Sequence, residues 1–121
     1  MTERLVRDFF AAADSLDIER FSSVLPKDVI WRFANFPVAN GIAEVRAQYA
    51  MVVDVAAKMH HDIIGIWRDR DCITVETRVH YTDQHGREFS YPGCDIIFVE
   101  GETIKEVRIF EIGRASCRER V

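Results

Sequence analysis

The sequence predicts an α+β fold in which N-terminal helices pack against a strongly curved antiparallel β-sheet. Apolar residues in the first half of the chain recur every three to four positions, which is typical of amphipathic helices. From residue 61 onward, apolar residues alternate with polar ones, which is the period of half-buried strands. Only short polar segments separate these alternating runs, so we expect hairpins between antiparallel neighbours. Helices followed by a series of strands favour the α+β class.

Three helices are predicted before residue 60. Thr2 can cap the first helix, and Asp17 can cap a second, short helix that Pro26 closes. A third helix is expected over residues 42–59. The apolar stripe of the first helix consists of Leu5, Val6, Phe9, Phe10, Ala13 and Leu16.

Five strands are predicted. The first covers residues 29–33 and leads into a turn over residues 35–41. The other four are expected near residues 61–68, 72–82, 87–99 and 103–110. Pro92 and Gly93 lie inside one of them; because proline cannot donate a ladder hydrogen bond and glycine tolerates bulge geometry, we expect a sharp bend there. A sheet curved in this way leaves a hollow on its concave side.

Composition limits the classes of function. The chain has 121 residues, 48% of them hydrophobic and 30% charged, which is the balance of one soluble globular domain. Its net charge is −4, so nucleic acid and anionic membranes are poor partners. No apolar run reaches the roughly 18 residues that span a bilayer, and the N-terminus lacks the pattern of a secretory signal. The three cysteines are odd in number and lack metal-ligand spacing, which favours a cytoplasmic protein.

The last ten residues, 112–121, differ from the rest of the chain. They contain three arginines, follow a well-patterned strand abruptly and show neither the helical nor the strand period. They also match the translation of a sequencing-adapter stretch. We therefore expect the domain to cover residues 1–111 and residues 112–121 to be a non-native tail. A genuine basic tail is the alternative.

Asp95 is the first candidate catalytic residue. The strand around it is apolar on both faces, so its carboxyl group is expected in a dry environment. Burial disfavours the ionised form and raises the pKa toward the range useful for a general acid or a neutral hydrogen-bond donor. A structural aspartate satisfied by Arg108 or by backbone amides is the alternative.

A row of ionisable residues follows on the strand predicted over residues 72–82. Glu76, Arg78 and His80 share one face of this strand. Directed into a hollow, Arg78 and His80 would supply an electrophile and a base, and His80 could titrate near neutral pH. On the outer face, the same row would be an ordinary solvated stripe.

Aromatic and polar side chains on other strands are candidates for substrate binding. Such side chains on the walls of a hollow describe a pocket for a flat apolar ligand, although the aromatic ones would serve a core equally well. The predicted substrate-binding residues are Trp31, Phe33, Asn35, His61 and Tyr91. The sequence has no phosphate-binding glycine loop, zinc-ligand spacing or serine-nucleophile motif, so no cofactor or metal is expected.

Three regions of the chain also carry a family resemblance. Their motifs are Asp8-Phe9-Phe10-Ala11-Ala12-Ala13-Asp14, Ala34-Asn35-Phe36-Pro37 and Asp95-Ile96-Ile97-Phe98. These motifs resemble SnoaL-like proteins of the nuclear-transport-factor-2-like, ketosteroid-isomerase-like superfamily. The resemblance covers nearly all of residues 3–110 and implies a cone-shaped sheet wrapped around the N-terminal helices. This fold carries isomerases, dehydratases, cyclases, epoxide hydrolases and non-catalytic binders, so it fixes no single activity.

The resemblance implies roles for several of these residues. Asp95 is similar to the buried, protonated aspartate with which ketosteroid isomerases bind the substrate oxyanion. The tyrosine of those enzymes is matched by Phe9, which has no hydroxyl group. The paired histidines of scytalone-dehydratase-like enzymes are similar to His60 or His61 together with His80.

The resulting prediction is a cofactor-independent isomerase, dehydratase or cyclase. It would move protons beside a carbonyl group of a small apolar, oxygen-bearing molecule such as a polyketide, terpenoid or steroid-like ring. His80 is predicted as the base, Asp95 as the protonated donor, Arg78 as the orienting group and Asn35 as a contact to the substrate oxygen. Asp95 as the base is the alternative assignment.

Two other functions remain open at this point. One is a non-catalytic module for binding a small ligand or for dimerisation. The other is an epoxide hydrolase, whose family pattern Arg78 matches, whereas His80 stands where an aspartate is expected. The resemblance also implies a homodimer formed through the outer face of the sheet.

Overall fold

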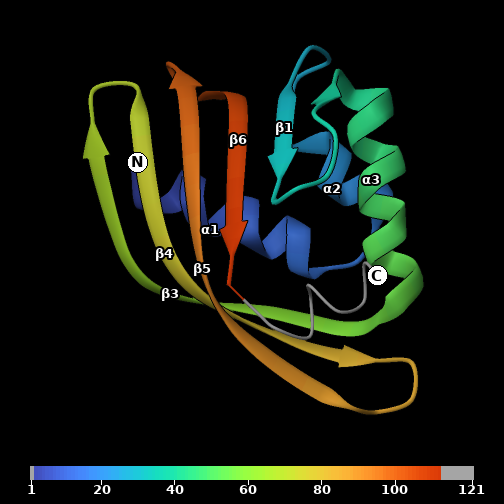
Figure 1. The fold of residues 1–121 in the computed structure, drawn as a ribbon. Coiled ribbons are helices and arrows are strands. Elements are labelled where there is room, and N and C mark those ends of the chain that lie inside the picture. The colour runs from blue at the N-terminus through green and yellow to red at the C-terminus, as the bar shows by residue number, and fades with distance from the viewer. Residues whose placement is uncertain (1, 113–121) are drawn as a thin grey trace.

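The computed structural model describes residues 2–112 and has the predicted α+β fold (Figure 1). Helices α1 (Thr2–Asp14) and α2 (Ile18–Ser23) come first, and Asp17 caps α2 by accepting hydrogen bonds from the amides of Glu19 and Arg20, as predicted. The remaining elements are β1 (Ile30–Phe33), β2 (Ala39–Asn40), α3 (Ile42–Val55), β3 (Ala56–Asp69), β4 (Cys72–Asp83), β5 (Glu88–Glu100) and β6 (Thr103–Glu111). The tail predicted over residues 112–121 lies, apart from Ile112, outside the described residues.

The strands form one mixed sheet in the order β2-β1-β6-β5-β4-β3. Strands β3 to β6 are antiparallel neighbours, as the short polar separators predicted. The sheet as a whole is mixed, because β1 pairs with β6 in parallel. Parallel neighbours need a long crossover connection, and residues 34–102 supply it through α3 and the other long strands.

Helix α3 ends at Val55, four residues before the predicted end at residue 59. The backbone becomes extended at Ala56 and then pairs with β4, so sheet hydrogen bonds replace the last predicted helical turn. His60 and His61 therefore lie within β3 rather than at a helix end. As neighbours on a strand they point to opposite faces, with the His61 side chain buried and the His60 side chain exposed.

Strand β5 runs through Pro92 and Gly93, and its pairing with β4 is unbroken there. It curves strongly (Figure 1), and no register shift accompanies Pro92 and Gly93 in its pairing with β4. The Pro92 carbonyl accepts from the Ile112 amide, so the proline nitrogen faces the same edge, beyond the end of β6. Its missing N–H therefore does not disturb the pairing with β4. Gly93 is required by space, since a Cβ atom there would lie 2.8 Å from the Thr77 hydroxyl oxygen.

The helices cover the concave side of the sheet (Figure 1). Helix α1 buries Val6, Phe9 and Phe10 against the strands, and the Phe21 ring of α2 stacks on Tyr49 of α3 at 4.0 Å between centroids. The Tyr49 hydroxyl donates to the Ala13 carbonyl (2.7 Å), which ties α3 to α1. Within residues 2–112, no helix is long and apolar enough to cross a membrane.

Candidate active site

Two adjoining chambers lie on the concave side of the sheet. The outer chamber has a volume of about 380 Å³, which is within the range of small-molecule sites, and the inner chamber has about 50 Å³. Both are lined by Phe33, Gln48, Val52, Tyr81 and Glu111, so these residues mark the boundary at which the chambers meet.

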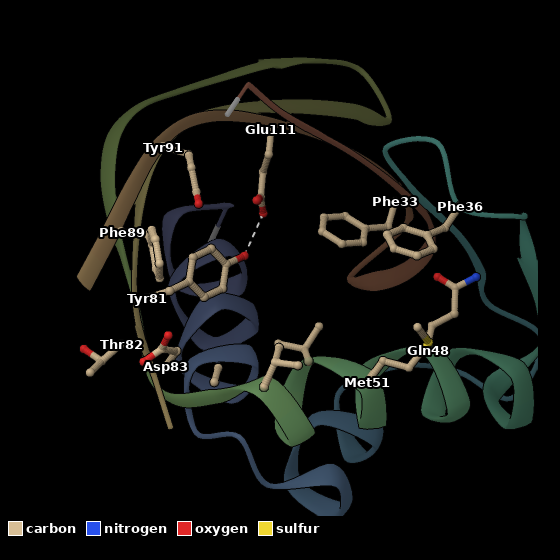
Figure 2. Close-up of a pocket in the computed structure, with 13 residues that line it drawn as sticks. Phe33, Phe36, Gln48, Met51, Tyr81, Thr82, Asp83, Phe89, Tyr91 and Glu111 are labelled. Carbon is tan, nitrogen blue, oxygen red and sulfur yellow. Dashed lines mark hydrogen bonds between the residues drawn. The ribbon is translucent and has the colours of Figure 1, made fainter. Parts of the chain in front are cut away.

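The outer chamber is lined mainly by aromatic rings. Figure 2 shows Tyr81, Phe89 and Tyr91 on one side of it and Phe33 and Phe36 on the other, with α3 below. The Phe33 and Phe36 rings are stacked at 5.6 Å, and the Phe89 and Tyr91 rings at 6.5 Å. Strands β1, β4 and β5 therefore supply walls that suit a flat, largely apolar ligand.

The inner chamber contains the Asp95 carboxyl group. Asp95 pairs with Val75 of β4 and Ile109 of β6, and all three side chains are buried on the concave face. Asp95 is only 3% exposed, and it lines the same inner chamber as His61. Burial raises the pKa of Asp95 to about 7; the charge of Glu111 acts in the same direction, and His61 opposes it. This carboxyl group can therefore exchange protons near neutral pH.

His61 lines the same inner chamber and is held by Asp14, the last residue of α1. Its Nδ1 donates to Asp14 Oδ1 (2.6 Å), while its backbone amide donates to Asp14 Oδ2 (2.8 Å). Burial alone would lower the pKa of His61, but the hydrogen bond and charge of Asp14, together with the charges of Asp95 and Glu111, outweigh it, so the pKa lies above the ordinary value. With Nδ1 engaged, Nε2 is the ring nitrogen available for chemistry.

Tyr81 and Glu111 form the polar part of the boundary between the chambers. The Tyr81 hydroxyl donates to Glu111 Oε2 (3.0 Å), as Figure 2 shows. Burial and the neighbouring Glu111 charge raise the pKa of Tyr81 well above its usual range, so the phenol stays protonated. In the part of the chain that the structure describes, no three His, Cys, Asp or Glu side chains are grouped closely enough to hold a metal ion.

The comparison with family models decides the classification. The model of the SnoaL-like domain matches residues 6–107. The chain belongs to the SnoaL-like domain family. The resemblance found in the sequence motifs is thereby confirmed, and the match extends from α1 to β6.

Solved structures from several bacteria share this fold. An NTF2-like protein from Burkholderia pseudomallei has a TM-score of 0.83 at 18% identity, covering 96% of this chain and 94% of its own. A Jannaschia protein named as a SnoaL-like polyketide cyclase has a TM-score of 0.80 at 13% identity, with 94% and 87% covered. An M. tuberculosis LEH-like epoxide hydrolase has a TM-score of 0.76 at 16% identity, with 90% and 80% covered. No curated protein sequence matches significantly. At these identities the structures establish the fold of this SnoaL-like protein alone.

Two of the predicted catalytic residues lie outside the chambers of the SnoaL-like fold. Arg78 and His80 are on the convex face of β4, because the apolar residues that alternate with them fill the concave side. Arg78 is exposed, and the His80 side chain is 41% exposed and bonded to Asp62 and Ser90. The expectation that Arg78, His80 and Asp95 share one cavity is therefore wrong.

Four of the five predicted substrate-binding residues line a chamber, and one does not. Trp31 and His61 line the inner chamber, Tyr91 lines the outer one, and Phe33 lines both. Asn35 is exposed in the turn after β1 and lines neither chamber, because the backbone turns at Ala34 before the amide can face inward.

Four lining or supporting residues were missed by sequence reasoning: Asp14, Gln48, Tyr81 and Glu111. Asp14 and Glu111 stand at the ends of their elements, where polar residues are ordinarily solvated. Gln48 carried a usable indication, since it interrupts the apolar stripe of α3 between Val45 and Val52. Tyr81 alternates with the ionisable row of its strand, which is typical of a core position, and nothing in the sequence connects it with a carboxylate.

Proposed function

We propose that this SnoaL-like protein is a cofactor-independent enzyme that moves protons beside a carbonyl group of a small, largely apolar molecule. The observation that carries the proposal is the pairing of Asp95 with His61 in the inner chamber. One is a buried carboxyl group with a pKa of about 7, and the other is a histidine fixed by Asp14. The fold is shared with the Jannaschia protein named as a SnoaL-like polyketide cyclase, which supports polyketide-like substrates.

Asp95 is assigned as the base. Its carboxylate takes a proton from the carbon next to the substrate carbonyl, and the C–H electron pair becomes the enolate. With a pKa of about 7, Asp95 is substantially ionised at neutral pH and is a stronger base than an ordinary carboxylate. The carboxylic acid so formed can return the proton to a second carbon, which is isomerisation. Alternatively, the enolate carbon can attack a second carbonyl carbon, and the oxygen of that carbonyl group takes the proton back from Asp95, which is aldol-type cyclisation.

His61 is assigned as the oxyanion donor. Because Asp14 raises its pKa, the imidazolium form persists to higher pH, and Nε2–H can donate to the enolate oxygen. Asp14 acts as a positioning residue, since its two hydrogen bonds to His61 fix both the ring and the backbone. The aromatic outer chamber would hold the remainder of the substrate out of water.

This assignment replaces His80 with His61 and removes Arg78 from the chemistry. It also disfavours epoxide hydrolysis by the Arg78-dependent pattern, because that side chain is exposed on the convex face. A non-catalytic ligand binder on the same scaffold would not need a buried carboxyl group with a pKa of about 7 in the same chamber as a histidine held by Asp14.

The test uses 2-tetralone, a bicyclic ketone, as a probe. The protein should accelerate exchange of its α-protons with D2O above the buffer rate, followed by proton NMR. Asp95→Asn should slow the protein-dependent exchange about 100-fold, because the base is lost while the shape is kept. His80→Ala is the matched control and should exchange like the wild type, since His80 lies outside the chambers.

Two outcomes contradict the proposal. If 2-tetralone binds but the wild type does not accelerate exchange, the protein is a binder of such molecules rather than this kind of catalyst. If Asp95→Asn retains the wild-type rate, Asp95 is not the base.

A further inference from the structure

Gln48 is a polar residue on the apolar side of α3. It follows Val45 by three positions and precedes Val52 by four, so all three lie on one helical face. Gln48 lines both chambers, and Figure 2 shows its amide beside Phe36 with the oxygen toward the cavity and the nitrogen away from it. A polar group at this boundary requires a partner.

One half of the amide has a partner and the other does not. The Gln48 nitrogen donates to the Pro37 carbonyl oxygen, and this contact fixes which end of the amide is which. Gln48 Oε1 is buried and receives no hydrogen bond from any of residues 2–112. An unpaired buried acceptor is costly, and it is tolerated where a ligand can supply the donor.

The surrounding side chains offer little to satisfy this oxygen. Phe33, Phe36 and Val52 are apolar, and the Tyr81 hydroxyl at the same boundary donates to Glu111. A solvent molecule, or a ligand that displaces it from the outer chamber, is therefore the remaining source of a donor.

We infer that Gln48 is a specificity-determining residue whose Oε1 accepts a hydrogen bond from a hydroxyl or N–H group of the ligand. The inference deepens the proposed function, on which it rests in taking this cavity as the substrate site. It narrows the substrate class to molecules that carry a donor on the ring system, such as a phenol or an enol. An otherwise identical methyl ether has no hydrogen to donate, so it would leave Gln48 Oε1 unpaired and place a second acceptor oxygen beside it. The ether should therefore bind more weakly.

Two probes of nearly the same shape test this inference: 2-naphthol, which has the donor, and 2-methoxynaphthalene, which lacks it. Dissociation constants are measured by ligand fluorescence. The wild type should bind 2-naphthol about tenfold more tightly than the ether, which is the effect expected of one hydrogen bond to a buried neutral acceptor. Gln48→Met keeps the length of the side chain but removes the oxygen, so the ratio should fall to about one.

The ratio of the two dissociation constants separates recognition of the donor from general disturbance of the site. Loss of the contact between Gln48 and Pro37 would weaken the binding of both probes by a similar factor and leave the ratio unchanged. Gln48→Glu retains an acceptor oxygen and should keep the preference for 2-naphthol. A wild type without preference, or a Gln48→Met variant that retains it, overturns the inference. These outcomes are independent of catalysis: a protein with a Gln48-dependent preference that fails to exchange 2-tetralone protons keeps this inference and loses the proposed activity.

Discussion

Burial of Asp95 should make the stability of the fold depend on pH in a way that one substitution removes. The folded pKa of about 7 lies above the ordinary value of 3.8, so the folded state holds a proton that the unfolded state has released. The free energy of unfolding should therefore fall as pH rises from the unfolded pKa through the folded one. At 1.36 kcal/mol per pKa unit, the full loss is about 4 kcal/mol, of which roughly 2.5 kcal/mol falls between pH 5 and pH 8.

Asp95→Asn keeps the shape of the side chain and cannot ionise. Its free energy of unfolding, from urea denaturation at half-unit steps between pH 5 and pH 8, should lack this loss. Relative to the wild type, the variant should therefore gain about 2.5 kcal/mol across the window. The other titrating groups are common to both proteins, so the difference between the two curves reports Asp95 together with its charge interaction with His61. Parallel curves would refute the claim that a carboxyl group is held in a dry chamber at this position.

Two further substitutions test the geometry. Gly93→Ala should destabilise the fold by about 1–3 kcal/mol in urea denaturation, because the new methyl group would meet the buried Thr77 hydroxyl at 2.8 Å, and adding Thr77→Ala should recover part of this loss. Asp14→Asn should lower the pKa of His61 in a proton NMR titration, since burial then acts with less opposition; an unchanged titration would contradict the role given to Asp14. Because the His61 pKa is raised in the folded state, its stabilisation is present below pH 6.5 and is lost as pH rises through the folded pKa, so this variant should lose stability on the acidic side.

The sequence predicted most of the fold because its patterns are local. The apolar periods located the three helices and the four long strands, and the Asp17 cap lies where expected. The two-residue β2 was missed, as was the parallel pairing of β1 with β6, because pairing between distant segments leaves no local pattern.

The site was predicted only in part for a related reason. Alternation showed that Glu76, Arg78 and His80 share a face, but the direction of that face depends on which residues fill the core. The apolar residues that alternate with them, such as Val75 and Val79, point into the core. The charged row therefore lies on the convex face of the sheet. Asp95 was correctly expected in a dry place, because both faces of its strand are apolar. Its proximity to His61 follows from the curvature of the sheet, which a linear pattern does not contain.

The inner chamber and the residues that support it join side chains from opposite ends of the described chain. Asp14 closes the first helix, whereas Glu111 ends the last strand, and the histidine and aspartate between them come from two more strands. During synthesis on the ribosome, the aromatic side chains of the chambers therefore stay exposed to solvent until β6 emerges and pairs with β5 and β1. Assembly of the chamber is thus a late event, and the nascent chain is most exposed to aggregation just before it is completed.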